Sequence, residues 1–198
     1  MKAIQITLLA GLIVCFFACG TSTTSQQAET SPKSIASTLP PAYSTEVVEA
    51  KLASPRKEMK TQLDEVSVTI NYGSPAVKDR ARWGGLVPWN EVWRTGANEA
   101  TRITFDKDAQ INGQPIAAGT YALFTLPKQS SWEIIFNTIS DQWGAYDYDP
   151  AKDVLRVTAT PQTVESMAET MDFMVEDGQV ILIWEHLRLP FSVTQNSK

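Results

Sequence analysis

The sequence has few of the side chains that most enzymes use for nucleophilic and metal chemistry. It holds one histidine, His186, and two cysteines, Cys15 and Cys19, among 198 residues. Both cysteines lie in the first twenty residues, so the rest of the chain has none for a zinc site, a Cys–His dyad or a disulfide. A metal site built from several histidines is excluded as well. We therefore expect no metal and no cofactor.

Basic residues are also too few for a nucleic-acid-binding protein. The 17 basic and 22 acidic residues give a formal net charge of -5, whereas binding to a phosphate backbone needs a basic face. The chain has neither a Gly-x-Ser-x-Gly motif nor a glycine-rich phosphate loop. With 43% hydrophobic and 20% charged residues, it has the composition of a soluble globular protein.

The N-terminal segment predicts export and lipid anchoring. Lys2 precedes an apolar run over residues 4–17, as in a secretory signal peptide. Ala18-Cys19 resembles a bacterial lipobox, although the aliphatic residue usual three places before the cysteine is Phe16 here. We expect a lipoprotein signal peptide over residues 1–18 and acylation, such as by palmitate, at Cys19. This places the protein in the bacterial envelope, on the periplasmic face or the outer surface. A plain signal peptide cut near Ala18 is the alternative.

Composition divides the remaining chain into a tether, a domain and a short tail. Residues 19–52 are rich in Thr, Ser, Gln, Ala and Pro without an apolar period, which predicts a flexible tether. For residues 46–52 a short helix and continued tether are both open. The domain is expected over residues 53–194, and residues 195–198 form a tail.

Alternating polar and apolar residues within the domain predict β-strands. Val66, Val68 and Ile70 alternate with polar residues. Asn112-Gly113 is a signal for a type I′ hairpin. Turn signals recur about every 8–12 residues, which favours an all-β fold, a single antiparallel β-sandwich with a jelly-roll-like or barrel-like arrangement as alternatives. Residues 161–169 are the best candidate for a short helix.

The first of two long loops, residues 71–101, combines tryptophans with basic residues. Its side chains suit an anionic or sugar ligand held by guanidinium groups and stacked on indole rings. Alternatively, the tryptophans pack the loop onto the sandwich and the arginines pair with Glu99 or aspartates. A tight turn is expected over 93–99, in which Gly96 and Asn98 tolerate positive φ and Arg94 and Glu99 are close enough to pair. The candidate ligand-binding residues are Trp93, Arg94, Asn98 and Glu99.

The second long loop, residues 137–153, is rich in aspartate and aromatic residues. Asp147, Asp149 and Asp153 have part of the spacing of a calcium loop, but the EF-hand glycine and glutamate are absent. We prefer a turn that starts at Asp149-Pro150, with Asp153 or Asp147 capping backbone amides. Aromatic and carboxylate side chains together also suit sugar binding. The candidates here are Trp143, Tyr146 and Asp147.

Several motifs together resemble domain-of-unknown-function family 2911. They are residues 72–80, 85–89, 92–101 and 118–127, followed by 143–146 with 153–157. The likeness runs from about Ser54 to Phe191, and 92–101 is its most specific block. Gly73 departs from the pattern, because a polar residue is expected there. The resemblance implies a secreted or lipid-anchored bacterial protein with one β-rich domain, and it brings no catalytic role.

Three hypotheses for the function follow. The first is a non-catalytic binding or interaction module, whose surface joins the two loops and takes a small-molecule, glycan or protein ligand. The second is a hydrolase of envelope or extracellular glycan or peptide that uses Asp147 or Glu99 with His186 or Arg94. The third is a purely structural envelope component, which would have no concave site.

Overall fold

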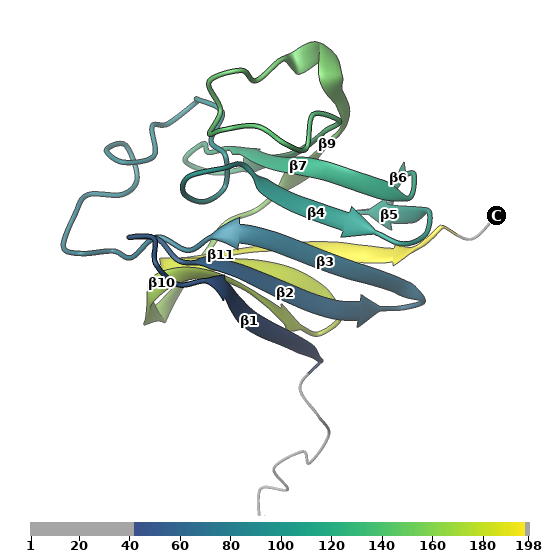
Figure 1. The fold of residues 1–198 in the computed structure, drawn as a ribbon, viewed down its shortest axis with the longest axis horizontal. Helices are drawn as coiled ribbons and strands as arrows, with labels where there is room; N and C mark the ends of the chain where they lie inside the picture. The colour runs from purple at the N-terminus through teal and green to yellow at the C-terminus, as the bar shows by residue number, and fades with distance from the viewer. Residues whose placement is uncertain (1–41, 197–198) are drawn as a thin grey trace, which may run out of the picture. The chain divides into compact units, whose positions relative to one another are not determined.

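The computed structural model describes residues 42–196, which form two antiparallel β-sheets (Figure 1). The larger sheet has the strand order β1-β2-β3-β4-β7-β8-β9 and the smaller one β10-β11-β5-β6. The strands are β1 Tyr43–Glu49, β2 Arg56–Leu63, β3 Val66–Gly73, β4 Thr101–Phe105, β5 Ala109–Ile111, β6 Gln114–Ile116, β7 Gly119–Leu126, β8 Trp132–Asn137, β9 Asp153–Ala159, β10 Gln162–Glu176 and β11 Gln179–Gln195. One turn of 3-10 helix, Pro150–Lys152, precedes β9.

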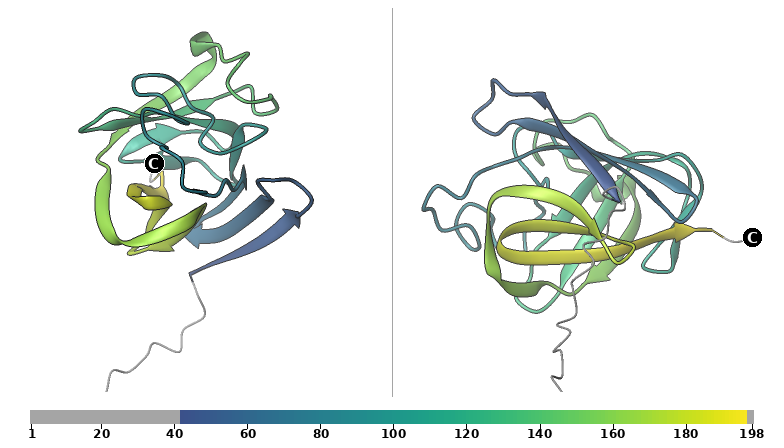
Figure 2. Two further views of the ribbon diagram at one scale, coloured as in Figure 1. Left: turned by 90° about the vertical axis from the view of Figure 1, so that its left-hand side faces the viewer. Right: turned by 90° about the horizontal axis from the view of Figure 1, so that it is seen from below.

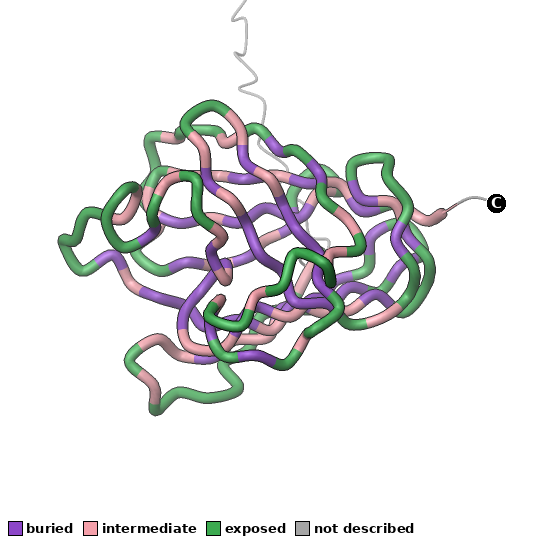
Figure 3. The backbone as a smooth tube through the Cα atoms, turned by 90° about the horizontal axis from the view of Figure 1, so that it is seen from above, coloured by how far each residue is buried: buried purple, intermediate pink, exposed green. Residues whose placement is uncertain are grey.

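The hydrophobic core lies between the two sheets. In β3 the apolar residues Val66, Val68 and Ile70 are buried, and the polar residues between them are more exposed. The long β10–β11 hairpin lies across one face of the larger sheet (Figure 2). Buried segments gather in the interior of the domain, and exposed segments lie mainly at its periphery (Figure 3). The predicted all-β sandwich is confirmed, and the sheets do not close into a barrel.

The predicted hairpin turn is confirmed in detail. Asn112 and Gly113 connect β5 to β6 with φ of 47° and 79°. Positive φ at both central residues is the signature of a type I′ turn, which matches the right-handed twist of the paired strands.

Two expectations about local structure are wrong. Residues 161–169 are not helical, because most of them belong to β10, whose backbone pairs with β11. The tether does not extend to residue 52, because β1 already pairs with β2 from Tyr43↔Thr61 onward. As an edge strand whose side chains are mostly exposed, β1 is held mainly by backbone hydrogen bonds. It therefore needs no apolar alternation that a sequence could reveal.

Several predictions concern parts of the chain that the structure does not describe. The signal peptide over 1–18, the acylation of Cys19 and most of the tether lie outside residues 42–196. Within the described range, no helix is long and apolar enough to cross a membrane.

Candidate functional site

The loop between β3 and β4, residues 74–100, is fixed to both sheets and is called the first loop below. Ser74 Oγ donates to the Met171 carbonyl of β10 at 2.7 Å. Trp93 N donates to Thr125 O of β7 at 2.8 Å, and Thr125 N donates back at 2.9 Å. These bonds give a loop of this length a defined conformation, as a binding site requires.

Within the first loop, the predicted tight turn packs directly against β3. Positive φ occurs at Thr95 (52°) and at Asn98 (64°). Of the two residues expected to tolerate positive φ, Asn98 adopts it and Gly96 does not. That glycine serves a close approach instead, because a Cβ there would lie 2.9 Å from Gly73 O. A Cβ on Gly73 would lie 2.1 Å from Ala97 O, so the turn requires the glycine that departs from the family pattern.

Tryptophans join the first loop to the core. Trp83 packs edge-on against Trp132 of β8 and Trp184 of β11, with ring centroids 5.0 and 5.6 Å apart. Trp93 stacks on Trp184 at 5.8 Å with an interplanar angle of 18°. Trp83 and Trp93 therefore pack the first loop onto the sandwich, as the alternative interpretation expected.

The expected pair between Arg94 and Glu99 does not form. Glu99 Oε2 instead accepts from Arg56 Nη1 at 3.0 Å, and Arg56 also donates to Asn71 Oδ1 at 2.5 Å and to the Ala100 carbonyl at 3.4 Å. The cause is the strand order β2-β3-β4, which brings the start of β2 beside the start of β4. Burial lowers the pKa of Arg56, although Glu99 opposes this shift.

Arg94 is left without an acidic partner, in a pocket of about 210 Å³ that we call the arginine pocket. Its guanidinium forms no ion pair within residues 42–196, and its buried Nε has no hydrogen-bond partner there. Burial lowers the pKa of Arg94. None of the residues that line the pocket is acidic, and those with polar or aromatic groups include Arg80, Arg94, Asn98, Trp93 and Trp184.

Two further hydrogen-bond donors belong to residues that line the arginine pocket. Arg80 Nη2 donates to the Ala76 carbonyl at 3.0 Å, which orients a second guanidinium at the pocket. Trp184 Nε1 is a buried donor without a partner among the described residues. Donors therefore outnumber acceptor side chains here, and they would accommodate an anion.

The structure brings the second loop, residues 138–149, beside this turn. Backbone pairing joins Glu99 to Trp143, and Gly144 N donates to Asn98 O at 3.1 Å. The expectation that the two loops form one surface agrees with this geometry. Trp143 and Tyr146 are 57% and 82% exposed, so they extend the surface outside the pocket.

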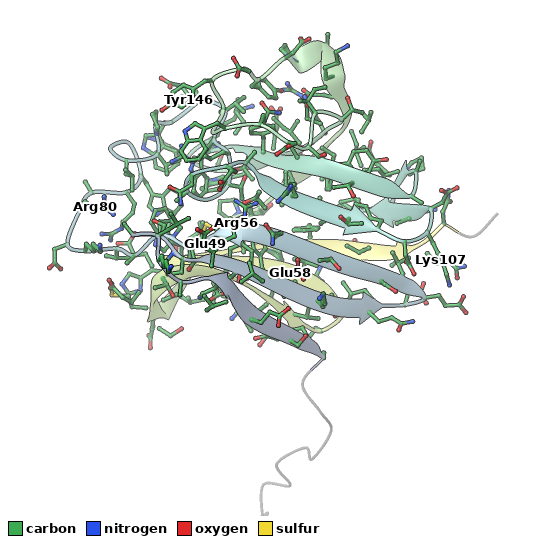
Figure 4. The ribbon with its side chains drawn as sticks, in the orientation of Figure 1. Glu49, Arg56, Glu58, Arg80, Lys107 and Tyr146 are labelled. Atoms are coloured by element: carbon green, nitrogen blue, oxygen red, sulfur yellow. The ribbon has the colours of Figure 1, made fainter. Side chains whose placement is uncertain are left out.

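Tyr146 and Arg94 both lie near Gly144. A Cβ built on that glycine would be 3.1 Å from the Tyr146 ring and 3.9 Å from Arg94 Cδ. In Figure 4, Tyr146 and Arg80 lie at the same end of the sheets and Lys107 at the opposite end. Asp147 is exposed. Of the seven candidates from the sequence, only Trp93, Arg94 and Asn98 line the arginine pocket.

Asp149 of the second loop and Asp153 at the start of β9 have structural roles. Asp149 Oδ1 accepts from Ala151 N at 2.9 Å and caps the 3-10 turn, so the prediction that Asp153 or Asp147 would cap is wrong. Asp153 Oδ2 instead accepts from Tyr148 Oη at 2.5 Å and from Arg156 Nη2 at 2.7 Å. Burial and Asp153 raise the pKa of Tyr148. Among the described residues, no group of three or more His, Cys, Asp or Glu is arranged to hold a metal ion.

The groups proposed for a hydrolase do not converge. His186 lines a different pocket from Arg94, and Glu99 is held by Arg56. Neither Glu99 nor Asp147 lines either of these pockets. Within the described residues, neither Asp147 nor Glu99 therefore shares one of these pockets with His186 or Arg94, as the hydrolase hypothesis requires.

Sequence reasoning did not select two residues of the arginine pocket. Arg80 is one of three other basic residues of the loop, with Lys78 and Arg82, and nothing in the sequence distinguishes it from them. Trp184 comes from β11, far along the chain, and it reads as an ordinary core residue of a strand. No local pattern connects it to the first loop.

Comparison with known proteins gives a family but no activity. Residues 54–193 match the model of a family described as "Protein of unknown function (DUF2911)", and this confirms the resemblance seen in the motifs. No curated protein and no solved structure matches the chain.

Proposed function

Since the chain belongs to the DUF2911 family of proteins of unknown function, we propose its function from the site: a non-catalytic, lipid-anchored binding module of the bacterial envelope. Its arginine pocket binds a small ligand that carries a carboxylate or phosphate group. The unpaired, half-buried Arg94 carries this proposal.

The charges of the domain support an anion at this place. The whole chain has a net charge of -5, yet Arg94 forms no pair with any carboxylate in the described part. A half-buried charge without a partner costs free energy that a bound anion would recover. Carboxylate and phosphate accept two parallel hydrogen bonds from a guanidinium, and Trp93 offers an apolar wall for the rest of the ligand.

Calorimetric titration tests the anion. We expect malonate and inorganic phosphate to bind the wild-type protein, and malonamide, which has the shape of malonate without its charges, not to bind. Arg94→Gln should weaken binding at least about tenfold, because a hydrogen bond to a charged group is lost. Lys107→Gln removes the same charge at the opposite end of the sheets and should leave affinity unchanged. Equal weakening by both variants would reduce the effect to net charge and contradict the proposal.

The lipid anchor rests on the N-terminal sequence and has its own test. In a bacterial host, the wild-type chain should incorporate labelled palmitate and fractionate with membranes. Cys19→Ser should abolish both, because the acyl chains supply the membrane affinity. A Cys19→Ser protein that still fractionates with membranes would contradict lipidation at this cysteine, and the anion-binding result would be unaffected.

A further inference from the structure

A second pocket, of about 300 Å³, adjoins the tryptophan cluster formed by Trp83, Trp93, Trp132 and Trp184. It shares no lining residue with the arginine pocket. We call it the tryptophan pocket. Trp83 and Trp89 are half-buried, and their rings lie 6.4 Å apart at an angle of 36°. The side chains relevant to binding are Trp83, Trp89, Trp132, Gln129, Glu185 and His186.

Two polar groups of the tryptophan pocket, Glu185 and His186, are held by neighbouring residues. The Glu185 carboxylate accepts a hydrogen bond from Arg82 of the first loop. His186 Nδ1 lies 3.0 Å from the Val164 carbonyl, and since a carbonyl only accepts, Nδ1 is the donor there. In the neutral ring Nε2 is then an acceptor. The pocket thus combines aromatic walls with neutral or neutralised hydrogen-bonding groups.

The backbone at the pocket is shaped by an irregularity in β11. Glu185 has a φ of 56°, which is uncommon for a residue with a side chain. The β10–β11 register shifts on both sides of the Ala168↔Glu185 pair. Such irregularities redirect side chains and occur often next to functional sites. Here the irregularity coincides with two polar residues that line the pocket, Glu185 and His186.

We propose that the tryptophan pocket binds a neutral hexopyranose unit of a glycan. The C–H face of such a ring packs on an indole, and its hydroxyls both donate and accept hydrogen bonds. The Gln129 amide, the Glu185 carboxylate and His186 Nε2 supply the complementary groups. This site is separate from the proposed anion site, so each stands without the other.

Quenching of tryptophan fluorescence tests the proposal with the full-length protein and five neutral saccharides: glucose, galactose, mannose, N-acetylglucosamine and chitotriose. At least one should bind saturably, and Trp89→Ala should weaken it about tenfold through the lost aromatic contact. Gln129→Ala should also weaken it, and since this variant keeps every tryptophan, it separates lost binding from a disturbed fold.

Two control variants localise the effect. Trp143→Ala removes an exposed tryptophan outside both pockets, and Arg94→Gln removes the centre of the anion site, so both should bind the saccharide as the wild type does. The proposal is overturned if none of the five saccharides binds, or if Trp143→Ala weakens binding as much as Trp89→Ala. It is also overturned if tetramethylammonium competes with the saccharide, because the walls would then form a cation site.

Discussion

Substitution by glutamine should affect the free energy of unfolding differently at Arg56 and at Arg94. Arg56 is 5% exposed and is held by Glu99, Asn71 and the Ala100 carbonyl. Arg94 is half-buried, and its Nε has no hydrogen-bond partner in the described part of the chain. Changing each to glutamine therefore separates an arginine that supports the fold from one kept for a ligand.

The structure sets the size of each effect. Arg56→Gln breaks several buried hydrogen bonds and leaves Glu99 unpaired. Breaking a buried ion pair costs about 3–5 kcal/mol, and we expect about 2–3 because the Glu99 side chain is 38% exposed. Arg94→Gln removes a charge that burial disfavours and breaks no ion pair. Its free energy of unfolding should stay within about 0.5 kcal/mol of the wild type or rise.

Urea unfolding followed by tryptophan fluorescence measures both effects, because the tryptophan cluster joins the first loop to the core. The midpoint should fall for Arg56→Gln and not for Arg94→Gln, with unchanged slopes. If Arg94→Gln costs 2 kcal/mol or more, its guanidinium supports the turn and the reasoning for an anion site is refuted. An Arg56→Gln protein as stable as the wild type would refute the role assigned to the Arg56–Glu99 pair.

Three other perturbations follow from the same contacts. Gly73→Ala places a Cβ against a carbonyl of the turn and should cost about 1–3 kcal/mol in urea unfolding; a neutral result would show that the turn shifts freely. Tyr148→Phe removes the donor to Asp153 and should cost about 1 kcal/mol in thermal unfolding; no loss would mean that water replaces the hydroxyl. A hydrogen bond from Lys128 lowers the pKa of Glu133, so folding favours the ionised form, and this stability is present at neutral pH and lost as pH falls below about 4.3. Urea midpoints from pH 7 to 3 should decline there, and less so in Glu133→Gln.

The sandwich was predictable because its strands bury one face. The alternation of apolar and polar residues shows that asymmetry in β3 and β4, and an Asn-Gly pair fixes one hairpin. The same logic explains the failures. The strand β1 has little apolar face to show, and the N-terminal part of β10 is mostly exposed, so neither left a period in the sequence. Both segments form strands because their backbones pair with a neighbouring strand.

The candidate site was predictable as a region but not as a set of contacts. Composition indicated the two loops, and the backbone does join them at Glu99 and Trp143. The ion-pair partner of Glu99 could not be predicted from the sequence. Proximity along the chain favoured Arg94 for Glu99, but the partner that strand order supplies is Arg56. A pairing between residues 43 positions apart depends on which strands are neighbours, and no local pattern contains that information.

Because Glu99 pairs with Arg56 and not with Arg94, one domain contains a stable scaffold and, beside it, an arginine without a carboxylate partner among the described residues. Glu99 is paired with Arg56, Asp153 accepts from Tyr148 and Arg156, and Glu185 is paired with Arg82. These three carboxylates are therefore already engaged, and Arg94 has no carboxylate partner within residues 42–196. Partly buried charged side chains are normally paired. One that lacks a partner while its neighbours are paired is expected at a functional site. By this criterion Arg94, rather than the more conspicuous exposed Trp143 and Tyr146, marks the place where a ligand completes the structure.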